Sequence, residues 1–468
     1  MATLMKNSYQ IPAGLAVEAA EHYQMVPTRR DKEICMPTGQ TVFSPQDPIN
    51  FVVTSANSFL DLNETKLKFD YMALNADNRP DGSANSVINR VIVEAGSVII
   101  EDIRNYNVCF QCLADLEFGP DLRGTNLCRT QGFSPAVTHS TLITAAPTII
   151  QTFIDYENGA PLITTNSIRS YEISIMGLLS QSKWYLPLMF MPPLNITLYL
   201  ERENIVCVTD GADTTASYQL LNVQLKIEKL TFEGNTMLDY AALVAGDMIK
   251  LPFTTWVNFS MEVPAGSTVT QEITQPYTFL NSTLTIMRNN TAQLNVQDRR
   301  TRKISARTSN TATQYQMMIG QRNYPSRPVP ITSNNLGEAF DELMKSINFN
   351  LLNILSSGNI IESGFNPNLQ VPYDKYYITA ASGQILEVAP TTLVYGCPTI
   401  CGKFIIGVNL SAHPSEGKST GLNTASSHDH IRLDITATVP AGGCRVDTWL
   451  NIDKWIHILP SRNISMQE

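Results

Sequence analysis

The sequence that decides the fold reads TKLKFDY at residues 65–71 and STLTI at residues 282–286. In both segments polar and apolar side chains alternate, which is the pattern of a β-strand with one buried face. A Phe-Leu pair precedes each segment, beginning at Phe59 and at Phe279, an offset of 220 residues. The two segments therefore predict equivalent strands in the two halves of the chain.

Four further pairs of segments repeat in the same order, at offsets between 225 and 235 residues. One pair is the best helix signal in each half, because apolar residues recur there at spacings of three and four. Asn335 and Glu338 resemble a helix-start pair in front of the second helix. Five matches in one order indicate a duplicated structural unit, since unrelated domains would not keep that order. The four pairs are residues 103–113 with 340–347, 175–178 with 405–408, 196–200 with 431–435, and 225–230 with 450–455.

Short alternating strands separated by turn residues are typical of a β-sandwich or a jelly roll. We predict an all-β fold made of two tandem jelly-roll β-sandwiches, each with a short helix in a connection between strands. The predicted divisions are an N-terminal arm at 1–32, jelly rolls at 33–233 and 251–462, a linker at 234–250 and a C-terminal tail at 463–468. The residues predicted for the two cores are Leu67, Phe69, Leu198, Leu200, Leu225, Ile227, Leu433, Ile435, Leu450 and Ile452.

The composition restricts the class of function. Charged residues make up 16% of the chain against about 25% in an average soluble domain, a balance that suits strands and large buried interfaces. The net charge of -9 excludes a protein that wraps nucleic acid with its whole surface, so any such contact is local. The first nine residues lack the apolar core of a secretory signal, and we expect synthesis without one.

Four segments carry a resemblance to a known family. They read FLDLNET at 59–65, IRNYN at 103–107, YLPL at 185–188 and GLNT at 421–424. With these segments, most of residues 35–460 resembles, in order and spacing, the double-jelly-roll major capsid proteins of tailless DNA viruses. The likeness is nearest to those of polinton-like viruses, adintoviruses and virophages, and more distant to the adenovirus hexon.

The resemblance implies a structural protein of the virion with no catalytic site and no cofactor. Members of the family form trimers with a pseudo-hexagonal outline, which tile an icosahedral shell. Three chains of two jelly rolls each would place six similar units around one axis. The implied partners are other copies of the chain, penton and minor capsid proteins, and packaged DNA through local basic segments. The implied place of assembly is the nucleus or the cytoplasm of the host cell.

Two alternatives of other classes remain open in the sequence. Jelly rolls also carry metal enzymes of the bicupin type, and His428 and His430 lie two residues apart, a spacing that puts both on one face of a strand. Asp434 would share that face, but the apolar alternation of the following strand places His430 on the polar, outward side. A glycan-binding spike or fibre protein would instead need an exposed aromatic patch, whereas the four tryptophans lie mostly within apolar strand patterns.

Two local motifs need an assignment. Cys109 and Cys112 form a single CxxC, and because structural zinc sites usually need a second pair, we interpret them as small core thiols beside the apolar face of the helix. The densest basic run contains Arg299, Arg300, Arg302 and Lys303. It is compatible with a solvated loop, with a contact to a neighbouring subunit and with a local contact to packaged DNA. The sequence alone does not decide among these three interpretations.

Overall fold

A computed structural model gives the structure of the protein. It describes residues 28–54, 57–118, 127–133, 137–143, 149–155, 162–180, 184–209, 212–232, 248–299, 301–331, 337–347, 376–379, 385–388, 404–411, 421–425, 429–459 and 461–467. Within these ranges no helix combines the length and the apolarity needed to span a membrane.

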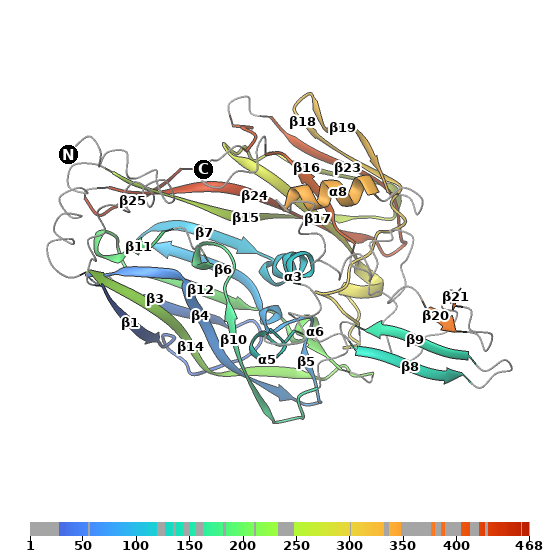
Figure 1. The fold of residues 1–468 in the computed structure, drawn as a ribbon, viewed down its shortest axis with the longest axis horizontal. Coiled ribbons are helices and arrows are strands. Elements are labelled where there is room, and N and C mark those ends of the chain that lie inside the picture. The colour runs from blue at the N-terminus through green and yellow to red at the C-terminus, as the bar shows by residue number, and fades with distance from the viewer. Residues whose placement is uncertain are drawn as a thin grey trace, which may run out of the picture.

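The first half of the chain folds into two antiparallel sheets packed face to face (Figure 1). One sheet follows the order β1-β14-β4-β10, with β2 attached to β14 and β11 attached to β4, and the other follows β3-β12-β6-β7. This is the strand arrangement of a jelly roll. The strands are β1 (Thr28–Cys35), β2 (Val42–Phe43), β3 (Pro48–Val53), β4 (Phe59–Leu74), β5 (Arg79–Pro80), β6 (Ile88–Ala95), β7 (Val98–Arg104), β10 (Ile168–Ser174), β11 (Leu186–Pro187), β12 (Leu194–Leu200), β13 (Cys207–Val208) and β14 (Ser217–Phe232). The helices are η3 (Ala84–Val87), α3 (Tyr106–Glu117), α5 (Cys128–Gln131), η5 (Leu178–Ser180), η6 (Leu188–Phe190) and α6 (Glu203–Val206).

The second half repeats this plan. Its sheets follow the orders β15-β24-β17-β22 and β16-β23-β18-β19, and β25 adds to the edge of β24. The strands are β15 (Ile249–Val263), β16 (Gly266–Ile273), β17 (Leu280–Asn289), β18 (Gln314–Ile319), β19 (Arg322–Pro330), β22 (Ile406–Asn409), β23 (Ile431–Val439), β24 (Cys444–Ile458) and β25 (Ile464–Gln467). The helical segments are η7 (Asn290–Leu294) and α8 (Gly337–Ser346).

The strand connectivity of the two halves is the same, which confirms the predicted duplication. Counting only the eight strands of the two main sheets, the first strand of each half pairs with the last, the third lies on the other side of the last, and a helix follows the fifth. Even one hairpin is repeated: β6–β7 and β18–β19 each turn through two residues that begin with a glycine, Gly96 at φ +63° and Gly320 at φ +59°. Two-residue hairpins need positive φ at this position, which glycine adopts without strain.

Four of the five sequence matches fall on equivalent elements: the third main strand, the helix, the seventh strand and the eighth strand. The fifth is out of register. Residues 405–408 overlap β22, whereas residues 175–178 follow the end of β10 at Ser174. Apolar side chains continue beyond β10 because the turn there packs into the core, where Leu178 and Leu179 are buried.

The alternation of polar and apolar residues that predicted the strands matches the alternation of side-chain burial in the structure. Along β4, residues from Thr65 onward alternate between buried and half-buried. All ten residues predicted for the cores are buried, with at most 3% of their surface exposed. Burying one such side chain fully contributes about 1.5–3 kcal/mol, so the two apolar interiors dominate the stability of the fold.

The predicted boundaries differ from the strand limits in two places. The first jelly roll begins with β1 at Thr28, inside the predicted arm, because β1 pairs along its whole length with β14. β25 occupies the predicted tail and pairs with β24. The rest of the arm and residues 234–247 of the predicted linker lie outside the described residues.

The connections that carry the two helices also build a sheet together. β8 (Val137–Ile143) and β9 (Ile149–Asp155) come from the first half, while β20 (Tyr376–Thr379) and β21 (Ile385–Val388) come from the second. They form one antiparallel sheet in the order β21-β20-β9-β8, which projects from the body of the molecule (Figure 1). The two halves are therefore joined at this end by backbone pairing.

A glycine in β22 tests how closely α8 is packed. A Cβ atom at Gly407 would lie 2.8 Å from the Cα of Leu343, in the backbone of α8. We therefore expect Gly407→Ala to displace α8 and to destabilise the protein by about 1–3 kcal/mol in thermal or denaturant unfolding. Gly337→Ala is the matched control, because a Cβ atom there meets nothing within 4 Å. Equal stability of the two variants would contradict this packing.

Candidate functional site: the interface between the two jelly rolls

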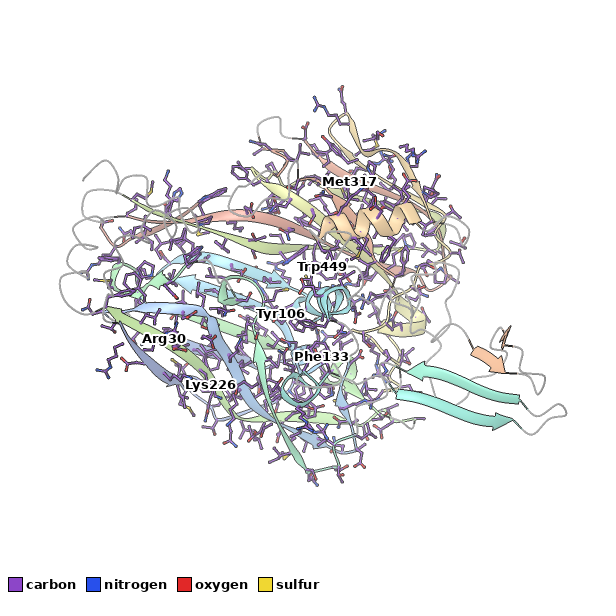
Figure 2. All side chains as sticks on the ribbon, viewed as in Figure 1. Arg30, Tyr106, Phe133, Lys226, Met317 and Trp449 are labelled. Atoms are coloured by element: carbon purple, nitrogen blue, oxygen red, sulfur yellow. The ribbon has the colours of Figure 1, made fainter. Side chains whose placement is uncertain are left out.

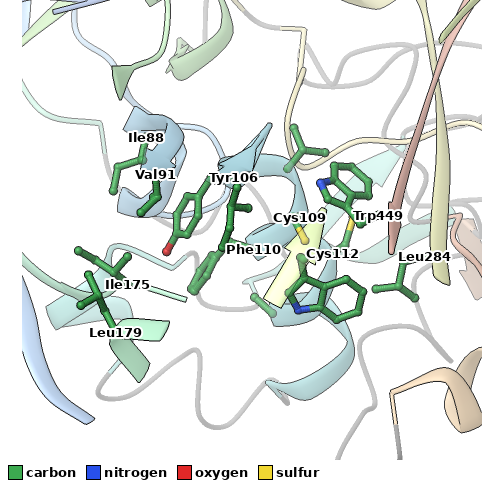
Figure 3. Packing of buried hydrophobic residues seen from close by; sticks show 14 of the residues in the cluster. Ile88, Val91, Tyr106, Cys109, Phe110, Cys112, Ile175, Leu179, Leu284 and Trp449 are labelled. Atoms are coloured by element: carbon green, nitrogen blue, oxygen red, sulfur yellow. The ribbon is translucent and has the colours of Figure 1, made fainter. Parts of the chain in front are cut away.

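The second jelly roll presents the outer face of one sheet to the first. On β24 the side chain of Thr448 bonds to Gln271 of the opposite sheet and points inward, so Trp449 points outward. Trp449 is fully buried, and its indole N–H donates to the carbonyl of Arg104 at the end of β7. Figure 3 shows Trp449 and Leu284 of the second jelly roll beside Cys109 and Cys112 of α3. The helix of the first jelly roll thus covers the sheet of the second.

A buried carboxylate in the first jelly roll holds a loop of the second. Asp81 accepts hydrogen bonds from the backbone N–H groups of Lys303 at 2.9 Å, Ile304 at 2.7 Å and Ser305 at 3.2 Å, and from the Ser305 hydroxyl at 2.5 Å. The guanidinium of Arg302 lies 3.7 Å away. Hydrogen bonds to a charged acceptor are stronger than those between neutral groups, so Asp81 fixes the course of this loop.

The basic run is therefore not a solvated loop. Arg299, Arg302 and Lys303 are exposed over only 3, 2 and 0% of their surface, and Arg300 lies outside the described residues. The solvated loop was one of the three interpretations that the sequence left open, because the partners of these charges lie far away in sequence. In the single chain these three cations offer no exposed charge to a nucleic acid backbone.

Each of the buried cations is met by oxygen atoms of the first jelly roll. The ammonium of Lys303 donates to the carbonyl of Asn204 at 2.6 Å. The backbone N–H of Arg299 donates to the carbonyl of Asp213, and its Nε donates to the carbonyl of Ala216. Burial and the neighbouring guanidinium of Arg299 lower the pKa of Lys303 to about 8. The run is thus a charged connection between the domains.

A second charged group lies on the covered face of the sheet, two residues before Trp449 in β24. Asp447 of β24 is fully buried and pairs with Arg288 at 2.5 Å and with Arg445 at 3.0 Å. Burial alone would raise its pKa, but the two guanidinium groups outweigh burial and hold the pKa of Asp447 below its usual value. Asn105, the residue before α3, donates to Asn258 and Ser260 of β15 and accepts from Arg445. The first jelly roll therefore contacts this ionised group.

A third ion pair joins the helix to the inserted loop. Arg307 of the second jelly roll pairs with Asp115 of α3, and both side chains are buried. Gln111, one turn earlier on α3, donates to the same carboxylate at 2.9 Å. Because a buried charge without a partner is costly, the pair requires α3 and the loop to keep their relative position.

Glu101 of β7 is a carboxyl group buried at the same junction. It accepts hydrogen bonds from the hydroxyl of Thr255 in β15 at 2.5 Å and from the backbone N–H of Leu178 at 2.9 Å. Burial raises its pKa from 4.5 to about 7, although both hydrogen bonds and the charge of Lys454 act in the opposite direction. The group therefore titrates near neutral pH.

The structure describes two of the three residues considered for a metal enzyme. His430 is exposed, and His428 lies outside the described residues. Asp434 is held by the hydroxyl of Thr270 at 2.7 Å and by Arg432 at 2.9 Å. Across the ranges that the structure describes, no group of three or more His, Cys, Asp or Glu residues could hold a metal ion.

The CxxC cysteines lie in the core, as the sequence interpretation placed them. Cys109 and Cys112 are fully buried and form no disulfide, and burial raises the pKa of Cys109 well above its usual value. Such thiols are poorly suited to redox or metal chemistry because the reactive thiolate is disfavoured. Trp256 and Trp449 are buried, and Trp184 donates its indole N–H to the carbonyl of Pro252. These three side chains do not form the exposed aromatic patch that glycan binding would need.

Sequence reasoning missed the carboxylates that organise the interface. Glu101 and Asp447 each interrupt an apolar strand, in VIIEDIR and in VDTWL, and a charge inside such a run is a usable signal of a buried pair. Asp81 gave no comparable signal, because it lies in the turn-like sequence RPDGS, where an aspartate is ordinary.

The comparison with known proteins rests on structure. No protein-family model matches the chain, and no curated protein does. The Faustovirus major capsid protein superposes with a TM-score of 0.56 at 10% identity, over 98% of each chain. The chain of the PBCV-1 virus capsid gives 0.56 at 10% identity, over 96% of this chain and 98% of the other. A chain of the Sputnik virophage gives 0.52 at 9% identity, over 94% of this chain and 88% of the other.

This is the fold of the viral double-jelly-roll proteins. The superpositions span both jelly rolls and the junction between them, which confirms the fold class that the sequence predicted. Because only about a tenth of the residues are identical, these superpositions establish the fold and not the function.

Removing the charge of Asp81 tests the connection between the jelly rolls. In Asp81→Asn the buried cations around the inserted loop lose a charged acceptor, and we expect a loss of about 3–5 kcal/mol in unfolding free energy. Differential scanning calorimetry should show a lower transition temperature. Glu262→Gln, which removes an exposed carboxylate from β15, is the control and should leave the transition unchanged. An unaltered transition in Asp81→Asn would contradict the role assigned to this group.

Glu101 predicts a pH dependence of stability. Because its folded-state pKa lies above the unfolded value, protonation stabilises the fold, and this contribution is complete below the unfolded pKa and is lost as the pH rises through about 7. We expect Glu101→Gln to remove up to roughly 3 kcal/mol of pH-dependent stability between about pH 5 and 8. Thermal unfolding across this range measures the effect, with Glu94→Gln on the neighbouring strand β6 as the control. Parallel curves for Glu101→Gln and the unsubstituted protein would disprove the assignment.

Proposed function

We propose that this chain is a major capsid protein, which works by self-assembly into a viral shell. The observation that carries the proposal is the doubled jelly roll: one chain holds two units of the same strand connectivity, fixed in one orientation by the buried ion pairs of Arg302 with Asp81 and of Arg307 with Asp115. The fold shared with viral capsid chains over nearly the full length of both partners supports the same conclusion.

The proposed building block is a trimer. Three chains around one axis place six similar units in a ring, and a block with six similar sides tiles a flat lattice such as the face of an icosahedral shell. Such a ring requires a rigid orientation of the two units within each chain. The angle between the units decides whether three chains can close into a ring. Obligate interfaces of this kind bury more than about 2,000 Å².

In the proposed shell the main partners of the chain are its own copies. Penton and minor capsid proteins would meet the blocks at the special positions of the lattice, and the chain would be a component of the virion. Contacts with packaged DNA would be local, because the net charge of -9 opposes broad electrostatic binding.

The test is the mass and outline of the purified full-length chain. We expect mass photometry to give three times the 51.8 kDa of one chain, and negative-stain microscopy to show particles of hexagonal outline or shell-like assemblies. A monomer at every accessible concentration would contradict the proposal. Stoichiometric iron, manganese or zinc in that monomer would favour the metal-enzyme alternative instead.

A further inference from the structure

A cavity lies between the two jelly rolls at the C-terminal end of α3. Its volume is about 310 Å³, at the lower end of the range of about 300–1,000 Å³ that is usual for small-molecule sites. The first jelly roll lines it with the last two turns of α3 and the turn after β10, and the second lines it with Thr254 and Trp256 of β15. Figure 1 shows α3 between the body of the first jelly roll and β15. A molecule in this cavity would contact both jelly rolls.

Aromatic rings form part of the cavity wall. Phe110 lies in α3, Phe118 directly follows α3, and Trp256 comes from β15. The ring of Phe133 packs against the first two, with centroids 6.2 Å from Phe110 and 5.6 Å from Phe118. Figure 2 shows Phe133 and Tyr106 on the side of α3 that faces the first jelly roll. These contacts hold the rings in position before any ligand binds, which lowers the cost of binding.

The electrostatics of the cavity favour a cation. Glu117, the last residue of α3, lines the cavity, and no basic residue lies in the last turn of the helix. The negative end of the helix dipole is at the same place. Among the residues that the structure describes, no cation pairs with Glu117; Lys66 donates instead to Ser174 at the cavity rim, at 2.9 Å, and to the carbonyl of Asn63.

The environment of Glu117 points the same way. Its side chain reaches solvent, but the protein around it raises the pKa of Glu117 by desolvation. Desolvation disfavours the ionised form of a carboxyl group, and a cation bound beside it would offset this cost. The cavity therefore combines a carboxyl group that lacks a cationic partner with aromatic faces, which themselves attract cations.

We propose that this cavity binds a small organic cation, an ammonium compound with an apolar body. The ammonium group would donate to the carboxylate of Glu117, and the body would lie against the rings of Phe110, Phe118 and Trp256. Met176, which also lines the cavity, offers a polarizable apolar contact. Because the lining comes from both jelly rolls, the bound cation would stabilise the junction between them.

Three probes that share one apolar body test the preference for positive charge. Phenethylammonium, phenethyl alcohol and phenylacetate carry a positive charge, no charge and a negative charge. In isothermal titration calorimetry with the full-length chain, we expect phenethylammonium to bind at least about tenfold more tightly than phenethyl alcohol, because hydrogen bonds to charged groups are the stronger ones. Phenylacetate should not bind. Phenethylammonium should also raise the unfolding temperature as its concentration increases.

Glu117→Gln tests the assigned carboxylate. The substitution keeps the size of the side chain and removes its charge, at a position that reaches solvent. We expect the affinity for phenethylammonium to fall at least about tenfold, and the affinity for phenethyl alcohol to stay unchanged. The matched control is Glu262→Gln, which removes an exposed carboxylate of β15 outside the cavity lining and should bind all three probes like the unsubstituted chain.

Ala114→Phe tests the location of binding. Ala114 lines the cavity from α3, so a larger side chain there would occupy the space of the ligand. We expect this variant to lose binding of phenethylammonium, with circular dichroism as the check that it folds. Should it fail to fold, the comparison of Glu117→Gln with Glu262→Gln still decides.

Several results would contradict the proposed site. Equal affinity for the three probes would show that the cavity does not select charge, and an unchanged affinity of Glu117→Gln for phenethylammonium would exclude the assigned carboxylate. Neither a heat of binding nor a thermal shift with phenethylammonium would exclude the site altogether. The cavity lies within one chain, so each of these results would leave the proposed shell-forming function standing.

Discussion

The structure depends on covering one sheet face that cannot face water. The outer side of the β15-β24-β17-β22 sheet carries Trp449, Leu284 and the ionised Asp447. Helix α3 and strand β7 of the first jelly roll exclude water from this face. Once water is excluded, every charge at the junction needs a partner, because an unpaired buried charge costs several kcal/mol. The apolar contact therefore requires the buried charges to be paired, and the pairs in turn hold the two sides of the apolar contact together.

The ion pairs explain orientation better than they explain stability. A buried pair regains little more than it loses in desolvation, but breaking one is costly, so the alternative arrangements of the two domains are penalised. Asp81 and Asp115 each meet a cation of the second jelly roll, and Asn105 of the first jelly roll donates a hydrogen bond to the ionised Asp447 of the second. These three contacts fix a rigid orientation between two bodies that an apolar contact alone would let slide. A block of the proposed shell needs a fixed angle between its units more than it needs additional stability.

The duplication also explains why a single chain leaves some of its sheet surfaces uncovered. Two copies of one plan have two copies of each surface, and one chain can join only one covering side to one covered face. The remaining pair, an exposed sheet face on the first jelly roll and an exposed β19 on the second, follows from the same geometry. The internal repeat thus supplies the contact within the chain and leaves the second face and the second edge of the same kind uncovered.

The sequence by itself determined the strands, the two helices and the repeat, because alternation and helical spacing are local properties that burial enforces residue by residue. It identified the ten predicted core residues and placed Cys109 and Cys112 in the core. It left the basic run undecided among three interpretations, since the burial of Arg302 and Lys303 depends on Asp81, more than two hundred residues earlier. Only the tertiary structure decided which charges meet, because electrostatic pairing depends on distance in space and leaves no periodic trace in the chain.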